Sequence, residues 1–284
     1  MTRTSLVRLS QRDAAAAFAL AERDPDRCTF IAGWIHDGGL SDSPRVPRGW
    51  LLGEMDGTQL LGLLYLSDSG ILVPAVNTQV GIDEVIAFGQ RQPDVVRVIV
   101  GERNLVETIW SGLERRGARA RLVRDQLAFA IQAGDLRSDS ALSLERATEN
   151  DLDEVVHASA AMAREEARDD PEGRNPHLFR MRILERVRRG RDFLHRDLAG
   201  HLDFKANVSA LSSVGGQIEG IYTLPEVRRR GLGKAGTATI TRWVLSQCGR
   251  AFLLVNEDND PARALYESLG YRQVGISRTL FVAP

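Results

Sequence analysis

A short segment that is rich in glycine and arginine, residues 228–236, holds the side chains best suited to chemistry in this sequence. Within it lie three arginines, one lysine and three glycines. Glycine allows close approach of the backbone to a ligand, and the unpaired amides at a helix start attract anions. Arginine can bind phosphate oxygens through two parallel hydrogen bonds. The segment therefore predicts a phosphate-binding loop between a strand at 217–224 and a helix at 231–247.

Two well-known phosphate-binding patterns fit this segment incompletely. Arg228 stands where a P-loop needs its first glycine, and Ala235 stands where it needs Ser or Thr, so that pattern fails. The three glycines match a dinucleotide fingerprint, and Glu257, 21 residues after the last of them, imitates the ribose-binding acid. That fingerprint should follow its strand directly, whereas residues 225–230 intervene. A nicotinamide-dependent oxidoreductase is therefore the less favoured interpretation.

A third family fits both this loop and a later segment. Residues 228–233 read Arg-x-x-Gly-x-Gly, which resembles the pyrophosphate loop of the GCN5-related N-acetyltransferases (GNAT), Gln/Arg-x-x-Gly-x-Gly/Ala. Residues 259–271 are similar to the family pattern Asn-x-x-Ala-x-x-Leu/Phe-Tyr-x-x-x-Gly-Phe/Tyr. The resemblance covers residues 144–284. The stretch 201–220 also looks like a bacterial two-part subgroup whose N-terminal domain has no assigned function.

The resemblance implies acetyl-CoA as co-substrate and no metal. The pyrophosphate would lie on the loop amides, and the pantetheine would pair with the preceding strand edge. A backbone N–H near Ile221 or Tyr222 would bind the acetyl carbonyl oxygen. Asn259 would contact pantetheine or order its loop, and its place before Asp-Pro is also typical of a helix cap. The expected acetyl-CoA-binding residues are Ile221, Tyr222, Thr223, Leu224, Arg228, Arg229, Arg230, Gly231, Leu232, Gly233, Lys234 and Asn259.

Tyr266 is the candidate general acid. Direct transfer expels a CoA thiolate, which needs a proton, and a phenol held nearby can supply one. The alternative is a core tyrosine, because Tyr266 shares one helical stripe with Ala262, Leu265 and Leu269. The resemblance favours the acid role.

The group that accepts the proton from the amine has several candidates. Glu219 shares a strand face with the expected acetyl site if no bulge intervenes. Members of the family often place a glutamate two residues earlier, where this chain has Gln217. Glu165 and Glu166 are alternatives that could equally bind a substrate ammonium, and water could relay the proton. Glu219 is therefore expected to be catalytic, and Glu165, Glu166 and Gln217 are expected to bind substrate.

One short motif occurs near the N-terminus and again near the middle of the chain. Ser10 precedes Asp13 by three residues, and Thr148 precedes Asp151 by the same spacing. Each pair comes just before a stretch with helical character. A hydroxyl followed three residues later by a carboxylate is a variant of the helix capping box. The repetition predicts two copies of one structural unit.

The later parts of the two halves also correspond, since residues 98–113 and 253–269 both predict strand, turn and helix. We expect a degenerate GNAT-like domain at 1–138 and a GNAT acetyltransferase domain at 139–284. The fold class is α/β (α+β), and each unit should be a mixed, mostly antiparallel sheet flanked by helices. Expected elements include a hairpin of 50–55 and 59–66 around Asp56-Gly57, a turn at Gly215-Gly216, a strand at 251–255, a helix at 261–269 and a strand at 272–282.

The first unit lacks the chemical signature of the second. Residues 75–82 stand where its phosphate loop should be, and they contain no arginine. Ser111 stands near the position that corresponds to Tyr266. We expect that this unit does not bind acetyl-CoA, and that it shapes the acceptor pocket or holds a dimer together.

Composition excludes several classes of protein. The net charge of the 284 residues is −1, so no whole-domain field for nucleic acid follows. The apolar run at 60–66 is far shorter than the roughly 20 residues of a membrane span. We found no signal peptide, and two cysteines make no disulfide framework, so a cytoplasmic location is expected. Lysine is scarce: of 37 basic residues only Lys205 and Lys234 are not arginine.

The predicted function is transfer of an acetyl group from acetyl-CoA to a primary amine, by direct attack in a ternary complex. The acceptor is a small-molecule or peptide amine that the sequence does not identify further, because such folds share a cofactor site and vary the acceptor site. No nucleic acid or membrane partner is expected, and the oligomeric state is open, a homodimer included. The alternative is a CoA-binding or scaffold module without catalysis.

Overall fold

The computed structural model describes residues 5–41, 49–167 and 170–283. The elements of the first half are β1 (Ser5–Arg8), the 3-10 helix η1 (Gln11–Asp13), α1 (Ala14–Arg23), α2 (Pro25–His36), β2 (Gly49–Asp56), β3 (Gln59–Ser67), β4 (Ile71–Ala75), α3 (Gln79–Arg91), β5 (Val98–Glu102), α4 (Arg103–Glu114) and β6 (Ala120–Gln132). Those of the second half are β7 (Glu145–Arg146), η2 (Glu149–Asp151), α5 (Leu152–Ala167), α6 (Pro171–Arg174), α7 (Pro176–Arg188), β8 (Asp192–Arg196), β9 (Leu202–Ser212), β10 (Gly215–Thr223), η3 (Pro225–Val227), α8 (Leu232–Cys248), β11 (Arg250–Asn256), α9 (Asp260–Leu269) and β12 (Arg272–Val282).

The two halves repeat one order of elements, as the sequence predicted. Each runs strand, 3-10 turn, helices, three strands, helix, strand, helix and strand. Both capping boxes form: the Asp13 carboxylate accepts from Ser10 N and Oγ at 2.8 Å, and Asp151 accepts from Thr148 N at 2.8 Å and Oγ1 at 2.7 Å. They cap η1 and η2, which lead straight into α1 and α5. The mixed, mostly antiparallel sheet with flanking helices confirms the predicted fold class.

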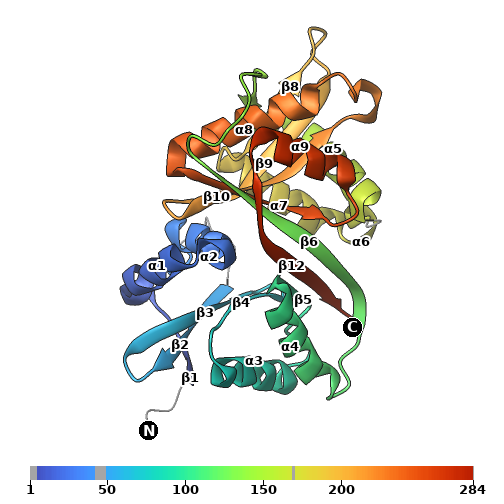
Figure 1. Ribbon diagram of the computed structural model, residues 1–284. Coiled ribbons are helices and arrows are strands. Elements are labelled where there is room, and N and C mark those ends of the chain that lie inside the picture. Colours follow the sequence, from blue (N-terminus) through green and yellow to red (C-terminus); the bar gives the residue numbers. More distant parts are fainter. Residues whose placement is uncertain (1–4, 42–48, 168–169, 284) are drawn as a thin grey trace.

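Strands of both halves form one continuous sheet in the described ranges (Figure 1). Its order is β1-β2-β3-β4-β5-β12-β6-β11-β10-β9-β8-β7. The last strand of each half has therefore changed places with the other: β6 pairs with β11, and β12 pairs with β5, both antiparallel. The strands β6 and β12 also pair with each other. The predicted boundary at 138/139 falls between β6 and β7 and stays a prediction, but neither half completes its own part of the sheet.

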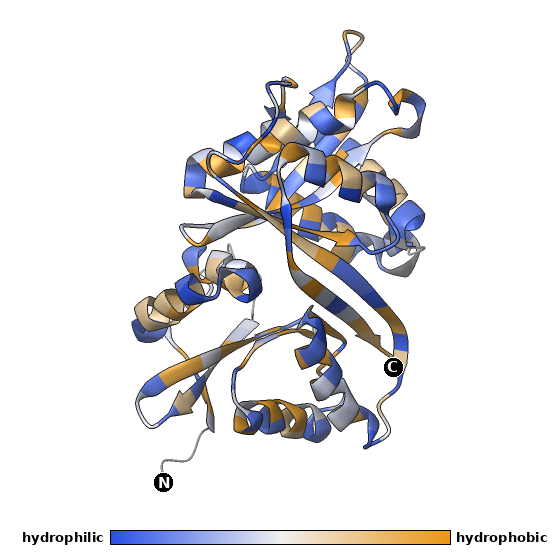
Figure 2. Cartoon of the chain, viewed as in Figure 1, coloured by the Kyte–Doolittle hydropathy of each residue, from blue (hydrophilic) through white to orange (hydrophobic). Residues whose placement is uncertain are grey.

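Helices cover both faces of the sheet in the second half. On β8, Phe193 packs toward α8 in one core cluster, while its neighbour Leu194 packs with α5 and α7 in another. Successive side chains of a strand point to opposite faces, which explains this division. Along β6 the bands in Figure 2 are blocks, because residues 124–126 are polar and residues 127–131 are apolar.

The helix α2 joins the first half to the second. A Cβ atom on Gly33 would lie 2.6 Å from the Cβ of Ala210 on β9, so only glycine permits this close packing. Next to it, Asp37 accepts two hydrogen bonds from the Arg191 guanidinium at 2.6 and 2.7 Å. The first half therefore supports the strand that lies directly beside β10.

Two predicted turns are displaced. The turn before β10 lies at 213–214, and Gly215 and Gly216 already belong to the strand. A Cβ atom on Gly216 would approach Val244 to 2.5 Å, so this glycine serves the packing of α8 and not a turn. The first hairpin turns at 57–58, one residue later than expected. The strand predicted at 272–282 has the bounds of β12.

Candidate active site

A cavity of about 600 Å³ opens where β10 and β11 diverge. The two strands pair in parallel at Gly216 and Gln217, and no later pair of the described residues continues this ladder. Beyond that point the cavity separates them. Its walls come from β10 and β11, from the helices α5, α8 and α9, and from Gln126 on β6. The divergence of two strands therefore creates the space in which a ligand could lie between them.

One end of the cavity is an uncapped helix N-terminus. Gly231 is the N-cap of α8 with φ of 83°, and it provides no side-chain cap. The first turn of α8 contains no acidic residue, and Arg229 and Lys234 line the cavity beside it. Arg229 has φ of 62°, a left-handed conformation that is costly for a residue with a Cβ atom. Unpaired amides, the helix dipole and two cations together make an anion site.

Most of the expected acetyl-CoA-binding residues meet at this cavity. The lining includes residues 221–223 of β10 and, from the loop and α8, positions 228, 229, 231, 233 and 234, as well as Asn259. Three expected residues are not part of it: Leu224, Arg230 and Leu232. Gly236, the third glycine of the motif, lies elsewhere, because a Cβ atom there would approach the Phe204 ring to 2.5 Å. Its role is helix–sheet packing.

Arg228 is bound by a carboxylate of the same chain. Its guanidinium donates to both oxygens of Glu165, at 2.6 and 2.7 Å, and its Nε donates to the Thr223 carbonyl at 3.0 Å. The Tyr222 hydroxyl also donates to Glu165, at 3.1 Å. The hydrogen bond from Arg228 lowers the pKa of Glu165. Glu165 is thus a partner of the loop and is poorly suited to accept a proton.

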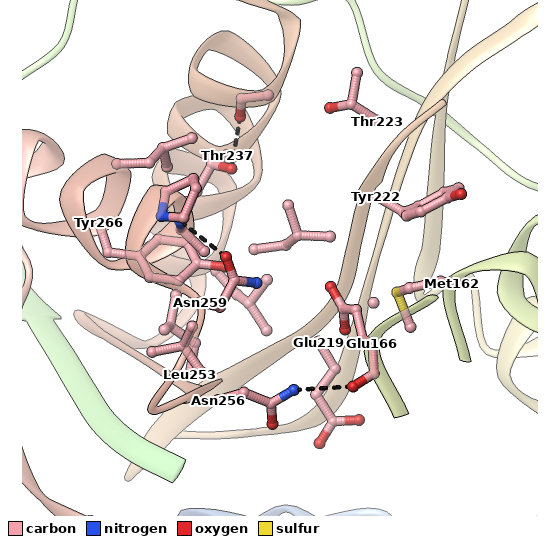
Figure 3. Close-up of a pocket in the computed structure, with 18 of the residues that line it drawn as sticks. Met162, Glu166, Glu219, Tyr222, Thr223, Thr237, Leu253, Asn256, Asn259 and Tyr266 are labelled. Atoms are coloured by element: carbon pink, nitrogen blue, oxygen red, sulfur yellow. Dashed lines mark hydrogen bonds between the residues drawn. The ribbon is translucent and has the colours of Figure 1, made fainter. Parts of the chain in front are cut away.

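Glu166 lies in a different electrostatic environment. It lines the cavity wall, where solvent reaches its side chain although protein surrounds much of it. Partial burial raises the pKa of Glu166, and the negative charge of Glu165 raises it further. Figure 3 shows Glu166 on the α5 side of the cavity, across from Tyr266. A carboxylate with a raised pKa is a better proton acceptor than an ordinary glutamate.

Tyr266 lies in the core and also lines the cavity. Its ring packs against Phe129 and Tyr271 in the core, and the residue is 7% exposed. It also lines the cavity. Burial raises the pKa of Tyr266, and the charge of Glu166 raises it further, so the phenol stays protonated and able to donate.

A bulge changes the expected strand face of Glu219. The register of β10 against β9 shifts after Gln217 and again after Glu219. Gln217 is 7% exposed and lies outside the cavity lining, but its Nε2 donates to the Glu219 Oε1 at 2.6 Å. Glu219 itself is exposed and lines the cavity. The simple alternation of 217, 219, 221 and 223 on one face is therefore wrong, because the bulge at 220–221 interrupts it.

Asn259 caps α9, since its Oδ1 accepts from Ala262 N at 3.2 Å, and it also faces the cavity (Figure 3). Sequence reasoning missed Asn256, whose Nδ2 donates to the Glu166 carbonyl at 3.4 Å. It also missed Gln126. No local motif marks Gln126, because it reaches the cavity only through the exchange of β6 into the sheet beside β11.

The corresponding helix start in the first half is occupied by a side chain. Glu54, which is 0% exposed, accepts hydrogen bonds from Asn77 N at 2.7 Å, from Thr78 N at 3.0 Å and from the Thr78 hydroxyl. Thr78 is also the N-cap of α3. Glu54 thus binds the two amides just before α3, and the Thr78 hydroxyl accepts from Gly81 N inside the helix at 3.1 Å, whereas the N-cap of α8 provides no side chain.

The described residues contain neither a metal-binding cluster nor a membrane-spanning helix. No group of three or more His, Cys, Asp or Glu side chains there is arranged to hold a metal ion. None of the helices in these ranges combines the length and the apolar composition that a bilayer crossing demands.

Comparison with known proteins agrees with this geometry. Residues 205–282 match a family model described as FR47-like protein. No curated protein matches this chain. A Drosophila protein of solved structure superimposes with a TM-score of 0.69 at 13% identity, covering 97% of this chain and 98% of that one.

Two further structures carry descriptions of the family. One is a tandem GNAT protein from the clavulanic acid biosynthesis pathway, with a TM-score of 0.58 at 14% identity, covering 98% of this chain and 97% of that one. The other is a GNAT acetyltransferase from Colwellia psychrerythraea, with a TM-score of 0.55 at 12% identity, covering 99% of this chain and 100% of that one.

The sheet, the opening between β10 and β11 and the glycine-rich loop define an α/β protein with two GNAT-like units. The chain has the tandem GNAT fold, so the family resemblance read from the sequence is confirmed at the level of the fold. Its mostly antiparallel sheet is not the open parallel sheet that the dinucleotide fingerprint requires.

Proposed function

We propose that the protein transfers an acetyl group from acetyl-CoA to a primary amine by direct attack in a ternary complex. One observation carries the proposal: a single cavity joins an uncapped, cationic helix N-terminus to a protonated tyrosine and a glutamate with a raised pKa. The first group suits a pyrophosphate, and the other two suit proton transfer to and from reacting atoms.

The co-substrate would lie between the diverging strands. Its phosphates would accept hydrogen bonds from the first amides of α8, with Arg229 and Lys234 beside them. Its pantetheine would lie along the edge of β10 that the separation from β11 leaves open. The N–H of Ile221 would donate to the acetyl carbonyl oxygen, where negative charge develops during attack.

The proton transfers are assigned from the electrostatics of the side chains. The amine nitrogen forms the new bond to the acetyl carbon as the bond from carbon to sulfur breaks. Glu166 would accept the proton that the amine loses, because it has the raised pKa, whereas Glu165 is bound to Arg228. Tyr266 would give its proton to the departing thiolate. Glu219, which accepts from Gln217, would help to bind the acceptor.

An amine acceptor fits the chemistry of the far end of the cavity. Glu166 and Glu219 line that end together with Met162 and the amide of Asn256 (Figure 3). Carboxylate and amide oxygens accept hydrogen bonds from an ammonium group, and the carboxylates also attract its charge.

Binding is tested by thermal unfolding with acetyl-CoA, free CoA and NADH. A ligand at 100 times its dissociation constant adds about 2.7 kcal/mol to native stability. We expect this gain with both CoA compounds and none with NADH. The double variant Arg229→Ala/Lys234→Ala should lose it. Arg115→Ala/Arg116→Ala, with the same change of charge at the exposed end of α4, should keep it. No gain with either CoA compound in the parent would refute the proposal.

Transfer is tested by the release of free CoA thiol in the presence of a panel of primary amines. Thiol release that depends on an amine, with the acetylated amine detected by mass spectrometry, is the expected result. Tight binding of acetyl-CoA without transfer to any amine of a broad panel would instead identify a CoA-binding or scaffold module.

A further inference from the structure

The bulge in β10 has an internal partner that the proposed mechanism does not use. Between the pairs Glu219↔Asn207 and Tyr222↔Lys205, two residues of β10 oppose a single residue of β9. The first of the two, Gly220, has φ of 59°. A Cβ atom there would overlap the Asn207 Oδ1, so the tight packing and the backbone conformation both require glycine. A bulge of this kind removes backbone groups from the regular ladder.

The carbonyl oxygen that the bulge releases is bound by a buried lysine. Lys205 is 2% exposed, and its Nζ donates to the Gly220 carbonyl at 3.1 Å. The charges that act on Lys205 come from three neighbouring elements: Arg186 on α7, Asp192 on β8 and Glu166 on α5. Burial and Arg186 lower the pKa of Lys205 to about 8, so it can donate at neutral pH. Burying an ammonium is costly, which indicates a specific role.

The geometry of the peptide unit connects this contact to the cavity. The carbonyl of Gly220 and the N–H of Ile221 belong to one planar peptide group, and the chain has no cis peptide bond in the described residues. In a trans peptide these two groups point in opposite directions. A carbonyl directed at Lys205 therefore directs the Ile221 N–H away from Lys205, toward the cavity that Gly220 and Ile221 line.

We propose that Lys205 is a positioning residue for the reaction: by holding the Gly220 carbonyl, it aims the Ile221 N–H at the acetyl carbonyl oxygen. This inference rests on the proposed acetyl transfer. It also gives a reason for lysine at this buried position, in a chain that uses lysine at only two positions. A guanidinium is a planar fork with five donors, whereas a compact ammonium suits a single carbonyl in a confined space.

The inference is tested by isotope-edited infrared spectroscopy of bound acetyl-CoA that is labelled with carbon-13 at the acetyl carbonyl. This measurement needs no acceptor. A hydrogen bond to the carbonyl lowers its stretching frequency, so the parent protein should show a downshifted band. Lys205→Met, which keeps an unbranched apolar stem and removes the ammonium group, should bind acetyl-CoA within about twofold of the parent and lose most of the downshift.

A matched control and a second variant exclude effects of stability. Ile240→Val removes a buried methylene of α8, which costs about 0.5–1.5 kcal/mol without touching the bulge, and it should keep the full downshift. If Lys205→Met does not fold, Lys205→Gln takes its place, because its amide is one bond too short for the Gly220 carbonyl. Once an acceptor is known, kcat should fall about 100-fold, the loss typical of one oxyanion donor, with KM for acetyl-CoA unchanged.

The outcomes separate this inference from the function on which it rests. A full downshift in the lysine variants would overturn the role of Lys205. Binding of acetyl-CoA by the parent without any downshift would overturn the assignment of the Ile221 N–H. Failure of the parent to bind acetyl-CoA would refute the proposed function itself.

Discussion

Replacing Glu54 by glutamine tests the claim that this carboxylate closes the helix start in the first half. Glu54 is fully buried and accepts three hydrogen bonds from Asn77 and Thr78. In Glu54→Gln, the oxygen that remains can still face Thr78, but the new amide nitrogen meets the Asn77 N–H. A hydrogen bond to a charged group is worth about 1.5–3 kcal/mol, and a buried donor without a partner costs about 1–3 kcal/mol. The sum is a loss of about 2.5–6 kcal/mol.

Chemical and thermal unfolding, followed by circular dichroism, measure this loss. For a chain of this size each kcal/mol shifts Tm by about 2–4 °C, so Tm should fall by roughly 5 °C or more. The control Glu114→Gln changes an exposed carboxylate of α4 and should stay within about 0.5 kcal/mol of the parent. If the unfolding free energy of Glu54→Gln lies within 1 kcal/mol of that of the parent, the carboxylate does not hold this helix start and the reasoning fails.

Three further predictions concern the second half. Tyr266→Phe should lower kcat about 100-fold and leave the Kd of acetyl-CoA unchanged, since only the hydroxyl is lost; full turnover would remove the acid assignment. Glu166 must be deprotonated to accept a proton, so activity should fall as the pH drops through its pKa, which is raised above the usual 4.5. Glu166→Gln should abolish this acidic limb of the kcat profile. A pH profile that the substitution leaves unchanged would exclude Glu166 as the base. Lys205 has a pKa of about 8 when folded and 10.5 as a free side chain, so the unfolded chain holds the extra proton between these values, and stability rises with pH across that window. The unfolding free energy of the parent relative to Lys205→Met should therefore increase by about 3 kcal/mol from pH 7 to pH 11, and equal slopes for both proteins would contradict the lowered pKa.

The sequence predicted the order of elements well wherever glycine and proline mark their ends. Helix α9 begins after Asn259 and ends at Gly270, which has φ of 99°, and both residues are visible as cap signals. The glycine-rich loop was also recognisable, because its function depends on local backbone conformation. Local chemistry and local structure therefore come from neighbouring residues and can be inferred from them.

The remaining features depend on contacts between residues that are distant in the sequence. No pattern within β6 shows that it pairs with β11, and the arrival of Gln126 in the cavity follows from that pairing. Likewise, Glu165 and Arg228 are 63 positions apart, and only the fold shows that they bind each other. A bulge is one of the alternatives that the sequence leaves open, and only the register of β9 and β10 gives its position.

The exchange of β6 and β12 has a consequence for synthesis of the chain on the ribosome. The strand β12 ends at residue 282 and fills the gap between β5 and β6, which are complete by residue 132. At about 5–20 residues per second, roughly 8–30 seconds pass between the two events. During that time β5 and β6 present unpaired edges, which are sites of association with other chains. The nascent protein is thus most vulnerable to aggregation in the interval before its last eleven-residue strand is made.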